Sequence, residues 1–159
     1  MNIEYGKVHN VVLDLSDSEP AVQDNYLNGA VRGFQAESLI GRKHADFLRL
    51  EKKGNRYDAR RKSDNYPIEI RTVGCTGIFE LSRSGSRGKD RSIDSNELQE
   101  FAKNNDFIVS RYVQTLPNVW HLNYVMHAGT TLLKMATIKG VLSKSTVDAI
   151  FEPVTELAA

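Results

Sequence analysis

The spacing of apolar residues changes abruptly near residue 54, and this change constrains the chain to a fold that packs helices against strands. Before it, apolar residues across 20–52 recur at helical intervals: Val22, Tyr26, Ala30, Phe34, Leu39, Ile40, Phe47 and Leu48. After it, residues 55–61 and 66–73 flank a polar turn sequence at 62–65, which is typical of a β-hairpin. The sequence therefore predicts two helices followed by a hairpin.

The remaining elements are consistent with one domain over residues 1–159, a usual length for a single core. Residues 8–15 are apolar enough for a strand or the edge of a helix. Further expected elements are a strand at Ile78–Ser82, a helix at Asn96–Lys103, strands at Phe107–Val113 and Val119–Val125, and a short helix at Thr146–Phe151.

Composition excludes several classes of protein. Apolar residues make up 40% of the chain and charged residues 26%, which is a globular balance. No stretch has the roughly 18–20 apolar residues of a membrane helix, and the first residues lack the hydrophobic segment of a signal peptide. The single cysteine, Cys75, excludes an internal disulfide and a cysteine-based zinc cluster. We expect a cytoplasmic protein without membrane partners.

Positive charge is concentrated in the middle of the chain. Residues 42–91 carry 14 of the 21 lysines and arginines but only 7 of the 20 aspartates and glutamates. Such a segment predicts an electropositive face that attracts phosphate backbones. A solvated surface patch is the alternative interpretation.

Four residues of the helical and hairpin segments form the candidate site. Asp58 lies on the first arm of the hairpin, while Glu69 and Arg71 share one face of the second arm. Carboxylates held close together repel each other unless a cation lies between them, and hard oxygen ligands suit Mg²⁺ or Mn²⁺. Glu37, on the preceding helix, could complete the site or accept a proton from water. The alternative is a half-exposed strand in which Asp58 pairs with a nearby arginine.

The order and spacing of these residues resemble the PD-(D/E)xK nucleases, the restriction-endonuclease-like superfamily, over roughly residues 35–125. The resemblance implies an α/β (α+β) fold with a central mixed β-sheet flanked by helices. It also implies that Asp58 and Glu69 are metal ligands, that Arg71 is the cationic residue and that Glu37 is the helix glutamate. The chain departs from the pattern because no proline precedes Asp58 and because Arg71 replaces the usual lysine. Arginine keeps its charge but cannot readily lose a proton to act as a base.

A basic segment rich in glycine and serine, residues 82–92, is a second candidate site. Its exposed backbone amides and cations suit contacts with phosphates, whereas it lacks the spacing of a nucleotide-binding P-loop. The predicted nucleic-acid-binding residues are Arg83, Ser84, Ser86, Arg87, Lys89 and Arg91. A mobile surface loop is the alternative.

These observations together predict a Mg²⁺- or Mn²⁺-dependent endonuclease that hydrolyses phosphodiester bonds in DNA, such as a type II restriction enzyme or one of its subunits. One small domain supplies one active site, so cleavage of both strands implies a homodimer or a partner subunit. Two alternatives remain open: a non-catalytic DNA-binding module of the same fold with a degenerate site, and an RNA-cleaving enzyme.

Overall fold

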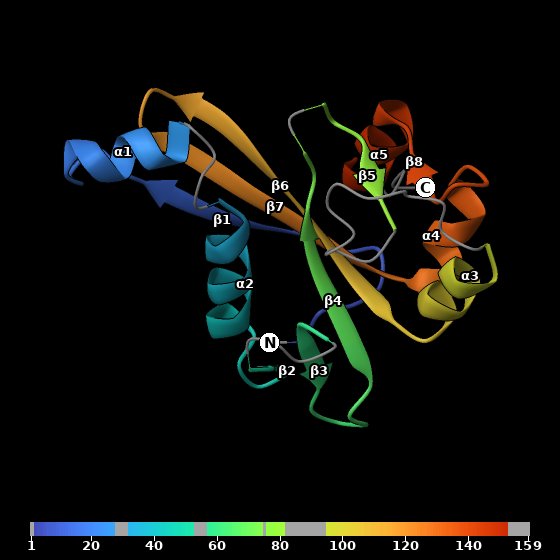
Figure 1. Cartoon of the computed structure of the whole chain (residues 1–159). Coiled ribbons are helices and arrows are strands. Elements are labelled where there is room, and N and C mark those ends of the chain that lie inside the picture. Colours follow the sequence, from blue (N-terminus) through green and yellow to red (C-terminus); the bar gives the residue numbers. More distant parts are fainter. Residues whose placement is uncertain (1, 28–31, 53–56, 75, 82–94, 153–159) are drawn as a thin grey trace, which may run out of the picture.

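The computed structural model describes residues 2–27, 32–52, 57–74, 76–81 and 95–152, and it shows a curled, mixed β-sheet flanked by helices (Figure 1). The helices are α1 (Pro20–Leu27), α2 (Arg32–Lys43), α3 (Ser95–Lys103), α4 (Gly129–Met135) and α5 (Lys144–Phe151). The strands are β1 (Val8–Asp14), β2 (Leu48–Leu50), β3 (Ala59–Arg61), β4 (Pro67–Thr72), β5 (Phe79–Glu80), β6 (Asp106–Leu116), β7 (Val119–Ala128) and β8 (Val141–Leu142). Within these ranges, no helix is long and apolar enough to cross a membrane.

Six strands form the main sheet in the order β1-β7-β6-β4-β3-β2. All neighbours are antiparallel except β4 and β6, which pair in parallel from Ile68–Asp106 to Thr72–Ser110. Parallel neighbours need a long crossover, and the chain between these two strands includes α3. Strands β5 and β8 form a separate pair.

The two-residue period of β4 divides the core into two layers. Ile68 and Ile70 face α2 and pack in a cluster with Ile40. On the other face of the sheet, Phe107 and Val109 pack among residues of α3, α4 and α5. The sheet is therefore covered by helices on both faces, and β4 lies between the two layers.

Most of the predicted elements are confirmed, and the largest difference lies after α2. The segment predicted at 8–15 forms the strand Val8–Asp14 rather than a helix, and the hairpin, both later strands and the helices near 96–103 and 146–151 are present. The prediction of helix to about residue 52 is wrong, because α2 ends at Lys43 and Leu48–Leu50 forms β2. Pairing of β2 with β3 decides this conformation, and Leu48 stays buried in the core. The strand expected at Ile78–Ser82 is shorter, Phe79–Glu80.

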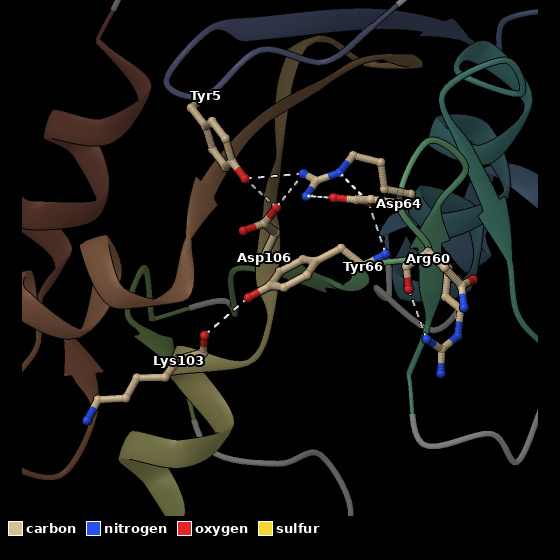
Figure 2. A network of polar contacts seen from close by, with 8 residues as sticks. Tyr5, Arg60, Asp64, Tyr66, Lys103 and Asp106 are labelled. Atoms are coloured by element: carbon tan, nitrogen blue, oxygen red, sulfur yellow. Dashed lines mark hydrogen bonds and ion pairs between the residues drawn. The ribbon is translucent and has the colours of Figure 1, made fainter.

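A buried ion pair joins the hairpin to the start of β6. Arg61 Nη1 lies 2.8 Å from Asp106 Oδ2, and Arg61 Nη2 lies 2.8 Å from Asp64 Oδ2. The Tyr5 hydroxyl donates to the same Asp106 oxygen at 2.6 Å (Figure 2). The Asp106 side chain is only 3% exposed, and Arg61 balances its charge while Tyr5 supplies a hydrogen bond. The network holds the N-terminal segment and the hairpin turn against β6.

Close packing of α3 against α4 requires a glycine at the first residue of α4. A Cβ atom at Gly129 would lie 1.8 Å from the Ala102 carbonyl oxygen. We expect Gly129→Ala to lower the free energy of unfolding, measured in urea, by about 1–3 kcal/mol or more, because the clash is with backbone. Gly74→Ala is the matched control, since a Cβ there meets nothing within 4 Å. Equal effects of the two substitutions would contradict this account.

Candidate functional site

The candidate site lies at the edge of β4, where pairing with β3 stops. The ladder joins Ala59 to Ile68 and Arg60 to Pro67. Beyond this point the Ile70 amide donates to Asp58 Oδ2 at 2.9 Å. A carboxylate therefore takes the position that a neighbouring backbone carbonyl would occupy, and Asp58 lies against the edge of the sheet.

Glu37 and Glu69 approach Asp58 from opposite sides of the sheet. Glu37 belongs to α2, which covers the face that carries Ile68 and Ile70. Glu69 projects from the other face of β4. Both glutamates lie close enough to Asp58 for its negative charge to raise their pKa values. Side chains from the two faces can meet here because β3 no longer covers the edge.

Burial and mutual repulsion raise the pKa values of the two glutamates into the neutral range. Burial raises the pKa of Glu69 to about 8, with a further contribution from the charge of Asp58. The Glu69 residue is only 4% exposed. The pKa of the partly buried Glu37 is raised to about 7 by the same two causes in the same order. Near pH 7 the cluster therefore favours the presence of a positive charge, either a proton or a cation.

Arg71 supports Glu69 from inside the protein. Its Nη2 lies 3.5 Å from Glu69 Oε2, and its Nη1 donates to the Glu80 carbonyl oxygen at 3.1 Å. The guanidinium lies 5.4 Å from the ring centre of Phe101 and 5.6 Å from that of Phe107. The side chain is 12% exposed. These contacts fix both the arginine and the carboxylate that it faces.

The donor chemistry of the cluster fits a hard divalent cation. Among the described residues, no three His, Cys, Asp or Glu side chains already form a metal cage. Mg²⁺ does not require one, since it is usually bound through one or two carboxylates and completes its shell with water and phosphate oxygens. Asp58 and Glu69 are the two carboxylates that we consider for this role, because Asp58 directly precedes Ala59 of β3 and Glu69 directly follows Ile68, the partner of Ala59 on β4.

Of the predicted constellation, Arg71 lies beside Glu69, and Glu37 and Glu69 each lie near Asp58. The second candidate, the basic segment with Arg83, Ser84, Ser86, Arg87, Lys89 and Arg91, lies outside the described residues.

Sequence reasoning missed Glu51, which lies directly after β2. Its amide donates to the Asp58 carbonyl oxygen at 2.9 Å, so that Glu51 stands opposite Asp58 on the neighbouring strand. Glu51 therefore extends the row of acidic residues that runs across the hairpin. Only the alternation Leu48, Arg49, Leu50, Glu51 could have indicated a strand here, and its short length made it indistinguishable from the end of a helix.

Comparisons of the chain with protein-family models, with curated proteins and with solved structures find no match.

The raised pKa values predict how stability depends on pH. Between about pH 4.5 and 8, Glu37 and Glu69 bind more protons in the folded than in the unfolded chain. Their contribution to the free energy of unfolding is therefore fully present below pH 4.5, the ordinary glutamate value, and is lost as pH rises through 7 and 8. We expect urea unfolding in EDTA to show this loss, with a slope of at most about 1.4 kcal/mol per pH unit for each proton.

Asp58→Asn provides the control for this measurement. The amide oxygen can still accept from Ile70, whereas the charge that raises the pKa of both glutamates is gone. The slope should be smaller in this variant, and millimolar Mg²⁺ at pH 8 should stabilise only the parent protein. An identical slope in both proteins would show that the cluster does not titrate as described.

Proposed function

We propose that this protein is a divalent-metal-dependent nuclease that hydrolyses phosphodiester bonds in DNA. The observation that carries the proposal is the Asp58 carboxylate, which accepts from the Ile70 amide of β4 and whose charge acts on both Glu37 and Glu69. A buried arginine lies behind them. The restriction-endonuclease-like pattern in the sequence and the mixed sheet flanked by helices are consistent with this function.

Each member of the cluster has a distinct proposed role. Asp58 and Glu69 would hold Mg²⁺ or Mn²⁺, and such an ion supplies charge stabilisation at a phosphate and lowers the pKa of bound water. Glu37, with a pKa of about 7, is suited to accept a proton from the attacking water. In its carboxylate form, Glu37 would act as the general base.

We assign Arg71, the cationic residue of the family pattern, a positioning role behind Glu69. Its guanidinium is nearly buried and faces Glu69. The positive charge opposes the effect of burial and lowers the pKa of Glu69. Arg71 thereby makes the carboxylate form of Glu69 more accessible to a metal ion. This role needs a permanent charge and no proton transfer, so arginine can fill it.

Cleavage of duplex DNA would require two such sites, supplied by a homodimer or by a partner subunit. A second candidate function is DNA binding without catalysis. The 4% exposure of Glu69 favours it, since a carboxylate so deeply buried is less available to a metal ion.

Nicking of supercoiled plasmid in Mg²⁺, Mn²⁺ or EDTA tests the catalytic proposal. We expect metal-dependent nicking that falls by about 100-fold or more in Asp58→Asn and Glu69→Gln, because each removes a charged ligand. Asp148→Asn is the control, since this exposed carboxylate pairs with Arg111 outside the cluster. If folded, DNA-binding protein leaves plasmid intact with every metal, the nuclease proposal is wrong and the binding function is favoured.

The Mg²⁺ and pH dependence of the nicking rate tests the positioning role of Arg71. In Arg71→Met the pKa of Glu69 should rise further, because the neighbouring positive charge is removed. We expect a higher Mg²⁺ concentration for half-maximal rate at pH 7 and a pH optimum shifted upward, with partial rescue in Arg71→Lys. A lower maximal rate with unchanged Mg²⁺ and pH dependence would instead indicate direct contact with the phosphate.

A further inference from the structure

Two arginines and a glutamate form a charged cluster on β2 and β3, beside the candidate site. Arg49 and Arg60 are direct partners across the two strands. Glu51 Oε1 lies 2.9 Å from Arg60 Nε and 3.6 Å from Arg49 Nη2. Like charges opposite each other on adjacent strands repel. An anion between them is therefore needed, and Glu51 supplies it.

This arginine pair lies one row away from the acidic residues of the site. Arg60 follows Asp58 by two residues, so their side chains leave the same side of the chain about 6.6–6.8 Å apart along it. Arg49 precedes Glu51 by the same interval, and Glu51 stands opposite Asp58. Positive and negative rows thus run side by side across the same strands.

The arginine pair is held in place and remains accessible. The Arg49 side chain is 59% exposed and that of Arg60 is 29% exposed. Arg60 Nη1 donates to the Asn65 carbonyl oxygen at 3.0 Å, and its guanidinium lies 5.1 Å from the ring centre of Tyr57. An anion that arrives from solvent meets a guanidinium that is already oriented, which lowers the entropy cost of binding.

We infer that Arg49 and Arg60 bind a backbone phosphate of the nucleic acid, and that Glu51 occupies the place of that phosphate when no nucleic acid is bound. Carboxylate and phosphate oxygens make equivalent charge-assisted hydrogen bonds with guanidinium groups. Exchange of one for the other leaves the two arginines neutralised. The inference rests on the proposed function, because it places this phosphate next to the one at Asp58 and Glu69.

A nucleic-acid phosphate fits this cluster better than a carboxylate from another protein. The cluster belongs to the basic segment 42–91, which has 14 lysines and arginines against 7 acidic residues. A polyanion with regularly spaced charges is attracted by the whole segment, while a single carboxylate gains only at one point. Neighbouring phosphates can also engage the arginine row and the metal-binding row together.

Binding of a fluorescent DNA duplex in EDTA, followed by anisotropy over a range of salt concentrations, tests the inference without cleavage. We expect Arg60→Gln and Arg49→Gln each to weaken binding and to reduce the slope of log K against log salt by about 1. Glu51→Gln should tighten binding by about two- to fivefold, because it removes the competing anion. Lys139→Gln, an exposed lysine between α4 and β8, is the control and should leave the slope nearly unchanged.

The expected changes in DNA affinity have opposite signs, because the arginine variants bind more weakly and Glu51→Gln binds more tightly. This difference distinguishes a phosphate site from an ion pair that is only structural. If Glu51 serves only to hold the two arginines, Glu51→Gln will weaken binding or leave it unchanged, and the inference is wrong. The double variant Glu51→Gln/Arg60→Gln, which leaves no unpaired carboxylate, controls for folding. If it retains the parent salt slope, the inference is also wrong.

The outcome of the DNA-binding experiment does not depend on whether the protein cleaves DNA. Intact plasmid with every metal, together with the expected effects at Arg60 and Glu51, would overturn the nuclease proposal and leave the phosphate site standing. Metal-dependent nicking with no effect of Arg60→Gln or Glu51→Gln on binding would overturn the phosphate site and leave the nuclease proposal standing.

Discussion

The candidate site depends on the hydrogen bond between the Ile70 amide and the Asp58 carboxylate, because this bond forms where β3 stops pairing with β4. If the ladder between β3 and β4 continued, a backbone carbonyl would accept the hydrogen bond from the Ile70 amide. The continuous sheet would then keep the side chains of its two faces apart. Glu37, which belongs to the α2 side, could then not reach the same carboxyl group as Glu69. A short strand and one side-chain acceptor therefore create a point where groups from both faces meet.

Local patterns in the sequence were sufficient to predict much of this arrangement. The two-residue period of β4 puts Ile68 and Ile70 on one face and Glu69 and Arg71 on the other. The polar turn at 62–65 fixes the hairpin, and its register brings Asp58 opposite Glu69. Both features involve residues close together in the chain, where turn chemistry and alternation decide the structure.

The features that sequence could not provide depend on distant partners. Leu48 continues a helical pattern, but pairing with β3 makes it part of a strand. Its side chain is buried, as a helix or a strand at this position would both require. The role of Glu51 follows from that strand and was missed with it. Burial of Arg71 depends on Phe101 and Phe107, which lie some 30 residues further along the chain. A hydrophobic period contains no information about such contacts.

The energetics of the cluster argue for a function at this edge. Burial of carboxyl groups costs stability even when they are paired, and apolar side chains of similar size would pack here at a lower cost. The chain compensates each acidic group differently: Glu69 by Arg71, Glu51 by Arg49 and Arg60, and Glu37 by a proton, because burial and the charge of Asp58 raise the pKa of Glu37 to about 7. The proton on Glu37 is the weakest of these compensations near pH 7, because it dissociates within the physiological range. A cation that replaced this proton would remove the remaining repulsion, which is consistent with the metal site that we propose.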